Sequence, residues 1–320
     1  MTSPSPSALP ASLPEPATAS QRNAHWIGAG LMALSGAGFS TLAILAKLAY
    51  AQGMNLAEIL CLRFGGAALL LMGGLALRQR RRIYTGLRAT LPLLLLGVIG
   101  YAVQASLYVG ALQRIPASVC ALLLYSYPAF VALLDWLVNR RRPTRREWGA
   151  MALALAGVML TIGRVEVVGP LDQWGVTMVL ASAVWYAGFI LTSNRLIRGA
   201  GSLVSTAWIT LGAFLTFGVV GWATGTLPSG LTAPRALIML AMIVFSTILP
   251  IVTFLAGMAR VGPTAAALLS TLEPVFTVGL AAVFLRELLT PLQFAGGALV
   301  LAAVILLSLP QKAWPGARDE

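Results

Sequence analysis

Residues 114–136 read RIPASVCALLLYSYPAFVALLDW, and residues 260–282 read RVGPTAAALLSTLEPVFTVGLAA. With a shift of 146 positions the two stretches align without a gap, and seven of their 23 residue pairs are identical. Leucine and alanine matches are common between membrane segments. The matched prolines, Pro128 and Pro274, and the arginine that begins each stretch therefore carry more weight. We infer from these matches that the chain contains an internal duplication.

Both stretches belong to a series of apolar runs that covers most of the chain. A helix needs about 20 mostly apolar residues to cross a bilayer. Ten runs approach or exceed that length, at residues 26–50, 57–77, 89–111, 115–138, 147–162, 172–196, 203–223, 234–259, 263–285 and 291–309. They lack the two-residue alternation of membrane β-strands, so helices remain the way to satisfy the backbone in lipid. The sequence therefore predicts an all-α integral membrane protein with ten transmembrane helices.

The composition excludes several other classes of protein. Hydrophobic residues make up 58% of the 320 residues and charged residues only 10%, whereas a soluble domain is about half apolar and about a quarter charged. A soluble enzyme, a nucleic-acid binder and a disordered protein are all inconsistent with these values. The net charge of +12 comes from bases grouped between the apolar runs. This grouping indicates a lipid bilayer as partner rather than nucleic acid.

The distribution of basic residues predicts the orientation in the membrane. With the N-terminus in the cytoplasm, 16 bases fall on the inner side and five on the outer side, and the loops 78–88 and 140–146 hold ten of the inner ones. This asymmetry predicts a bacterial-type inner membrane protein with both termini cytoplasmic. Residues 1–24 are rich in Ser, Pro and Ala and predict a disordered cytoplasmic tail, and residues 312–320 predict a second tail.

The duplication divides the chain into two repeats of five crossings each, at residues 25–165 and 166–311. A weaker match at an offset of 148 places Trp26 on Trp174 and extends the duplication toward the start of each copy. Because five is an odd number, the second copy enters the bilayer from the opposite face. Such an inverted repeat gives a carrier two related states, one open to each side of the membrane.

The ends of the repeats resemble a known family. The residues that carry the resemblance are ALQRIPAS at 111–118, LEPVF at 272–276, RELLT at 286–290 and LRF at 62–64. They are similar to the EamA-type carriers of the drug/metabolite transporter superfamily. The resemblance covers residues 26–309, and the ten-crossing layout is similar to that of YddG-type amino-acid exporters.

The resemblance implies a central cavity lined mainly by crossings one, three, four, six, eight and nine. The family often has an acidic residue at the end of the fourth crossing, as Glu287 ends the ninth here, but the matching residue in this chain is Arg141. A structural pair of acids is therefore not expected. Arg141 instead adds to the basic inner loop.

Polar and aromatic side chains recur on single helix faces within the predicted crossings, where such groups usually face a cavity or another helix. One interpretation is a water-accessible pocket with aromatic walls, which suits a small amphipathic solute. The other is hydrogen bonding between helices by Ser and Thr, with Tyr and Trp at the membrane interface. The candidate substrate contacts are Ser40, Tyr101, Gln104, Tyr108, Tyr125, Ser182, Trp185, Tyr186, Ser246, Thr253 and Ser270.

Three further residues in the duplicated stretches are candidates for transport itself. Glu273 could titrate as a proton-coupling site or contact a substrate amine. Its structural alternatives are an ion pair with a base or hydrogen bonds from backbone freed by Pro274. Pro128 and Pro274 each remove a helix hydrogen bond and predict a kink. Each kink could be a hinge or a static bend.

These features predict a secondary transporter of small organic metabolites that works by alternating access, in particular an exporter of neutral or aromatic amino acids. The alternative is an exporter of drugs or other metabolites on the same fold. No paired acids or nucleophile arrangement predicts an enzyme, and the single His and two Cys predict no metal site or cofactor. A channel would need a continuous polar stripe, and an assembly protein would have no polar cavity between its halves. The sequence does not determine the oligomeric state.

Overall fold

The computed structural model consists of helices joined by short turns and loops in the part of the chain that it describes. These residues are 19–78, 86–140, 143–162, 171–200, 202–227, 230–261, 266 and 269–308. No strand occurs among these residues. The tail at 312–320, Arg141 and most of the tail at 1–24 lie outside them. The helices of the first half are α1 (Ala19–Ala51), α2 (Leu56–Arg78), α4 (Leu87–Leu95), the π-helix η1 (Leu96–Tyr101), α5 (Ala102–Ala111), α6 (Ala117–Leu124), α7 (Tyr127–Asn139) and α8 (Arg145–Ile162).

The helices of the second half are α9 (Gln173–Ala200), α10 (Ser202–Ala223), α11 (Ala233–Ile243), the π-helix η2 (Val244–Ile248), α12 (Leu249–Val261), α14 (Leu272–Leu285) and α15 (Pro291–Ser308). One boundary differs from the sequence prediction. Helix α1 begins at Ala19, so residues 19–24 extend this helix instead of belonging to the predicted disordered tail.

Seven helical segments among the described residues are long and apolar enough to cross a membrane. They are His25–Ala51, Leu56–Leu77, Thr90–Ala111, Ala117–Val138, Gln173–Ser193, Leu203–Ala223 and Ala233–Val261. The other three predicted crossings do not reach that standard. Helix α8 begins with Arg145, Arg146 and Glu147, α15 is short, and the crossing at 263–285 is described only in part.

The two halves depart from regular α-helix at matching places. The π-helix Leu96–Tyr101 interrupts one crossing of the first half, and the π-helix Val244–Ile248 interrupts its counterpart 148 positions later. Helices α7 and α14 each end at an arginine in the left-handed conformation, with φ of 53° at Arg140 and 56° at Arg286, which are 146 positions apart. An arginine rarely adopts this conformation, so the coincidence supports the duplication.

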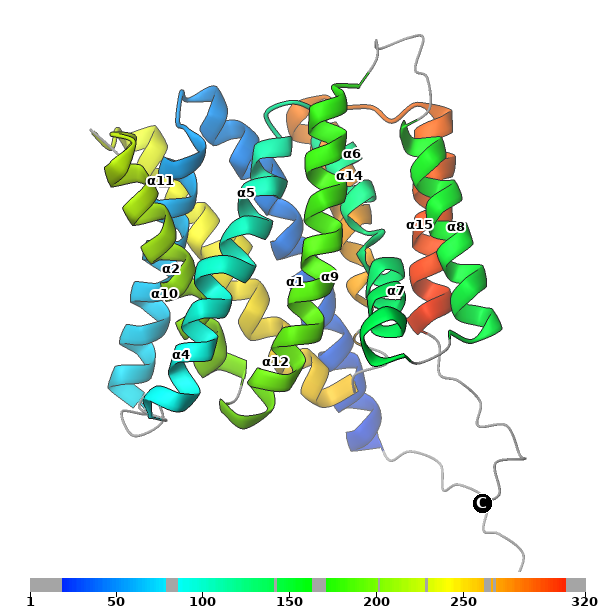
Figure 1. Ribbon diagram of the computed structural model, residues 1–320, viewed down its shortest axis with the longest axis horizontal. Coiled ribbons are helices and arrows are strands. Elements are labelled where there is room, and N and C mark those ends of the chain that lie inside the picture. The colour runs from blue at the N-terminus through cyan, green and yellow to red at the C-terminus, as the bar shows by residue number, and fades with distance from the viewer. Residues whose placement is uncertain are drawn as a thin grey trace, which may run out of the picture.

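The packing of the helices follows the same symmetry. Helix α8 packs against α15 and α2 against α10, while α1 contacts α12 and α14, and α9 contacts α5, α6 and α7. The contact of α1 with α12 in one half corresponds to that of α9 with α5 in the other. The contact of α1 with α14 corresponds in the same way to that of α9 with α6 and α7. In Figure 1, α1 begins at the lower end of the bundle and α9 at the upper end, so these matching helices run in opposite directions.

Candidate functional site

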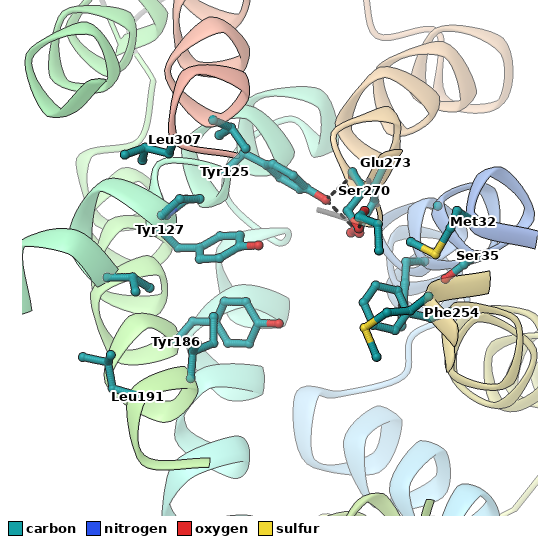
Figure 2. A pocket seen from close by; sticks show the side chains of 18 of the residues that line it. Met32, Ser35, Tyr125, Tyr127, Tyr186, Leu191, Phe254, Ser270, Glu273 and Leu307 are labelled. Carbon is teal, nitrogen blue, oxygen red and sulfur yellow. Dashed lines mark hydrogen bonds between the residues drawn. The ribbon is translucent and has the colours of Figure 1, made fainter. Parts of the chain in front are cut away.

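A large cavity, which we call the vestibule, lies between two groups of helices: α1, α12 and α14 on one side, and α9 with its neighbours α5, α6 and α7 on the other. Its volume is about 880 Å³. Tyr125, Tyr127 and Tyr186 form one wall, and Met32 and Phe254 belong to the facing wall (Figure 2). The vestibule extends to the end of the bundle at which α1 begins. Its lining there comes from the first part of α1 and α8 and from the last part of α7, α12 and α15.

A smaller cavity of about 130 Å³, the deep chamber, continues from the vestibule toward the middle of the bundle. The two cavities share Phe39, Tyr125, Tyr127, Tyr186 and Glu273, which therefore mark the boundary between them. The chamber also contains polar groups that come from α2, η1, α5 and α14. These groups belong to Arg63, Tyr101, Gln104, Tyr108 and Thr277.

Glu273 lies at the boundary of the two cavities because the break at Thr271 places it in the first turn of α14. The hydroxyl oxygen of Tyr125 lies 2.8 Å from Oε2 of Glu273 and 3.0 Å from the carbonyl oxygen of Ser270 (Figure 2). A phenol has one proton to donate, so Tyr125 can serve only one of these acceptors fully. No Lys or Arg among the described residues forms an ion pair with Glu273.

Arg63 is a chamber residue that the sequence analysis did not select. Its side chain projects from α2 and is 3% exposed. Nε donates a hydrogen bond to Oγ1 of Thr247 in η2 at 3.1 Å, and the guanidinium carbon lies 5.0 Å from the centre of the Phe64 ring. The signal that could have identified it is a charged residue inside an apolar crossing, which is costly unless it faces a cavity or a partner.

Aromatic rings connect the vestibule to the chamber. The rings of Tyr127 and Tyr186 meet edge-to-face at 4.9 Å, and Tyr186 stacks on Phe189 at 6.0 Å. Tyr101 stacks on Phe189 at 5.6 Å and meets the edge of Phe64 at 5.3 Å. Rings in such arrangements hold one another in place, so the walls offer a rigid apolar surface with hydroxyl groups at its edge.

The structure brings six of the candidate substrate contacts together with Glu273. Tyr125, Tyr186 and Glu273 line both cavities, Ser270 lines the vestibule, and the chamber takes three more. Those three are Tyr101, Gln104 and Tyr108. These three residues come from η1 and α5. The side-chain amide of Gln104 donates a hydrogen bond to Oγ of Ser182 in α9 at 3.3 Å.

Three of the predicted hydroxyl contacts line neither cavity. Ser40 donates to the carbonyl oxygen of Ala37 at 2.7 Å, Ser246 to that of Met242 at 2.6 Å, and Thr253 to that of Leu249 at 2.8 Å. Each hydroxyl thus bonds to its own helix, as Ser and Thr often do within helices. The expected polar face on the eighth crossing instead packs against α1, where Ser35 donates to the carbonyl oxygen of Pro250 at 2.8 Å.

Two predicted contacts on α9 also lie outside the cavities. Ser182 is fully buried between α9 and α5 and donates to the carbonyl oxygen of Gln104 at 3.2 Å. Trp185 is 41% exposed on the outside of the bundle, and its indole N–H donates to the carbonyl oxygen of Gly100 at 2.9 Å. Gly100 belongs to η1, where the π-helix changes the backbone bonding pattern. Packing on this π-helix explains the outward position of Trp185.

The two prolines occupy a different kind of site from the predicted kink. The helix ends at Leu124 and a new one begins at Tyr127, so Pro128 lies in the first turn of α7 and lines the vestibule. Pro274 likewise lies in the first turn of α14. Proline is well tolerated there because first-turn N–H groups lack partners within the helix. Both crossings are therefore broken rather than bent.

Glu287 closes the end of the bundle opposite the vestibule. Its carboxylate accepts hydrogen bonds from the backbone N–H groups of Ala117 and Ser118 at the start of α6, both at 3.1 Å. It also forms an ion pair with Lys47 of α1 at 3.1 Å. A carboxylate at a helix N-terminus satisfies unpaired N–H groups and the helix dipole. One side chain thus joins α1, α6 and the segment that follows α14.

A second ion pair lies at the same end of the bundle. Arg114 and Asp172 meet at 2.9 Å, and Asp172 also accepts hydrogen bonds from the N–H groups of Trp174 and Gly175 at the start of α9. The hydrogen bond from Arg114, together with those from the backbone, lowers the pKa of Asp172 below its usual value. This pair connects the loop after α5 to α9.

Comparison with known proteins agrees with this architecture. The model of the EamA-like transporter family matches residues 26–163 and again residues 173–309. The chain therefore belongs to the EamA-like transporter family, and it is a membrane transporter rather than an enzyme.

Several curated relatives are of similar length. The uncharacterized transporter YwfM of Bacillus subtilis is 27% identical over 76% of this chain and 83% of its own length. The threonine/homoserine exporter RhtA of Escherichia coli K12 is 28% identical over 68% of this chain and 70% of its own length. One crystal structure of a protein superposes with a TM-score of 0.62 over 89% of this chain and 96% of that chain. At 17% identity this likeness shows the fold alone.

Proposed function

We propose that this protein is a secondary transporter that exports small organic metabolites, in particular neutral and aromatic amino acids, by alternating access. The observation that carries the proposal is a cavity between two duplicated halves that reaches one end of the bundle, while ion pairs and hydrogen bonds join the helices at the other end. Transporters of this general design hold their substrate midway across the membrane, between their repeats.

The proposed architecture has ten crossings in two inverted five-helix repeats, at residues 25–165 and 166–311, around the central cavity. The matching π-helices, the matching arginines in the left-handed conformation and the opposite directions of α1 and α9 support it. We place the protein in the inner membrane with both termini in the cytoplasm. The vestibule then opens to the cytoplasm, which is the side from which an exporter takes its substrate.

The proposed substrate contacts are the residues that line the two cavities, namely Tyr101, Gln104, Tyr108, Tyr125, Tyr186 and Ser270. Glu273 has the position of an amine contact, and a proton could compete for the same carboxylate. Pro128 and Pro274 lie in the first turns of α7 and α14, and Pro128 lines the vestibule. At these breaks the helical segments can pivot, so we assign the hinges to them.

Two observations favour amino acids as the substrate class. The aromatic walls suit an apolar side chain, and the polar groups of the chamber suit a small charged backbone. The relative RhtA is named a threonine/homoserine exporter. The alternative substrates are drugs or other metabolites, and the experiment must distinguish them from amino acids.

The test is counterflow in proteoliposomes that contain the purified protein. Vesicles loaded with an unlabelled amino acid should accumulate the same labelled compound, with a panel that includes threonine, homoserine, leucine and phenylalanine. Tyr186→Ala should lower the initial rate on the order of tenfold because it removes an aromatic ring that lines both cavities. Val184→Ala is the matched control, since Val184 lies on the same helix and is 41% exposed. Accumulation of cationic drugs without any amino acid would contradict the proposal.

A further inference from the structure

The deep chamber contains a buried positive charge that has no negative partner within the described part of the chain. Arg63 is 3% exposed, and arginine stays protonated in proteins. Its neighbours are the hydroxyl of Thr247 at 3.1 Å and the side chain of Tyr101. No carboxylate among the described residues forms an ion pair with it. Hydrogen bonds to neutral groups leave the charge itself uncompensated, so an anion or water that reaches it from the chamber stabilises it further.

The orientation of Arg63 is fixed while part of its hydrogen-bonding capacity remains available. The bond from Nε to Thr247 and the contact with the Phe64 ring hold the guanidinium group. Arginine has five N–H donors, of which Nε serves Thr247 and the guanidinium also forms a hydrogen bond with Tyr101. The remaining donors are on the two terminal nitrogens, which together match the two oxygens of a carboxylate.

A carboxylate lies elsewhere in the lining of the same chamber. Glu273 accepts a hydrogen bond from Tyr125 at 2.8 Å and forms no ion pair among the described residues. Glu273 and Arg63 are not paired with each other, and Tyr108 interacts electrostatically with both. The chamber therefore presents a cationic and an anionic group that are held apart by their own helices.

We infer that Arg63 and Glu273 are the two poles of a receptor for a zwitterion, in which Arg63 binds the substrate carboxylate and Glu273 binds its ammonium group. This inference rests on the proposed function and specifies its substrate as a free amino acid with both groups unblocked. The aromatic residues at the boundary, Tyr127 and Tyr186, then contact the side chain. An amine without a carboxylate, or an acid without an amine, leaves one buried charge uncompensated.

The first test uses the wild-type protein, so it does not depend on the folding of a variant. Counterflow is measured for the best amino acid of the panel and for its amide, its decarboxylated amine and its N-acetyl derivative. The amide and the amine lack the carboxylate charge, and the N-acetyl derivative lacks the ammonium charge. Each should have a KM higher on the order of tenfold or more, as expected when one charged partner is lost from a buried pair. Equal KM values for the amino acid and its amide would overturn the inference.

The second test assigns the two poles to residues. In Arg63→Gln the ratio of the KM of the amine to that of the amino acid should fall from about tenfold or more toward one. Arg63→Lys should keep part of the discrimination because it keeps the charge. The ratio is measured within one protein sample, so a lower folded fraction does not change it. Arg235→Gln is the matched control, because Arg235 contacts the carbonyl oxygen of Gln52 and the carboxylate of Glu58 and lines neither cavity.

Glu273→Gln completes the assignment. It should raise the KM of the amino acid but not that of its N-acetyl derivative, which lacks the ammonium group. Two ratios decide the outcome: the KM of the amine over that of the amino acid for Arg63→Gln, and the KM of the N-acetyl derivative over that of the amino acid for Glu273→Gln. If amino acids are transported but both ratios stay at their wild-type values, the zwitterion receptor is wrong and the proposed function stands. If no amino acid is transported by the wild-type protein, the proposed function fails as well.

Discussion

Two carboxylates that bracket α14 have different surroundings. Glu273, in the first turn of the helix, faces both cavities and accepts one hydrogen bond from a phenol. Glu287, two residues beyond its last turn, bonds to two backbone N–H groups, one hydroxyl and one ammonium group. Saturated bonding suits a structural residue, whereas an open, weakly bonded carboxylate suits a site that binds a ligand.

We expect Glu287→Gln to destabilise the protein and to loosen the closed end. The amide keeps an acceptor for the start of α6 but loses the charge that pairs with Lys47. Hydrogen bonds to charged groups contribute about 1.5–3 kcal/mol, so a thermal-unfolding assay in detergent should show a lower Tm. Asp172→Asn, at the more exposed ion pair with Arg114, should have a smaller effect. An equal decrease in Tm for Glu287→Gln and Asp172→Asn would contradict the assigned role of Glu287.

We expect Glu273→Gln to remove the pH dependence of transport while exchange persists with a higher KM. In the wild type, protonation of Glu273 at low pH removes the charge that binds the substrate amine, so transport should slow as the pH falls. The carboxyl is surrounded by Tyr108, Tyr125, Tyr127 and Tyr186, which stay neutral over this range. Counterflow rates between about pH 5 and about pH 8 are the measurement. An unchanged pH profile in the variant would assign the dependence to another group.

Single residues show where sequence reasoning reaches its limit. Helical spacing placed Tyr101, Gln104 and Tyr108 on one face, and the structure places all three in the chamber. The same reasoning selected Ser246 and Thr253, whose hydroxyls bond to their own helix. A short hydroxyl side chain can satisfy itself locally, and spacing alone does not distinguish that arrangement from a cavity contact.

At the scale of helices, the sequence predicted most positions well but not their interruptions. The predicted crossing at 203–223 corresponds to Ser202–Ala223. The π-helices at Leu96–Tyr101 and Val244–Ile248 had no signal in the apolar pattern, since both interrupt continuous apolar runs. Packing between helices determines where a π-helix forms, and a single sequence does not reveal packing. The matched prolines identified the location of the breaks but not their form.

Close packing between α10 and the α4–η1 segment gives a prediction at this scale. A Cβ atom on Gly212 would clash with the carbonyl oxygen of Leu94, whereas a Cβ atom on Gly218 of the same helix would meet open space. Gly212→Ala should therefore destabilise the protein by about 1–3 kcal/mol through overpacking. Gly218→Ala should be neutral or slightly stabilising. Tm values in detergent check both variants. An unchanged Tm for Gly212→Ala would contradict the prediction, because it would show that α10 and the α4–η1 segment can move apart without loss of stability.

At the scale of the whole molecule, the duplication predicted two halves, and the family match covers both of them. The sequence did not predict which end of the bundle is closed. A transporter that alternates must be stable in two forms, so its sequence is compatible with both. The structure shows one arrangement, with the vestibule at the end where α1 begins and the Glu287 contacts at the other.

The central claim is that the two ends of the bundle open in turn. Spin-label pairs report this directly when they are placed on helices from opposite walls or in the turns that end them. The pair Leu137→Cys and Ala259→Cys lies at the vestibule end, and the pair Gln52→Cys and Gln113→Cys lies at the closed end; all four residues are exposed. The two native cysteines are buried and are replaced by serine.

Distances within each pair are measured in lipid with and without a saturating transported amino acid. The account predicts reciprocal changes: in part of the population the vestibule-end distance shortens while the closed-end distance lengthens. Distances that stay constant at both ends, or that lengthen together as in a channel, would contradict alternating access by this protein.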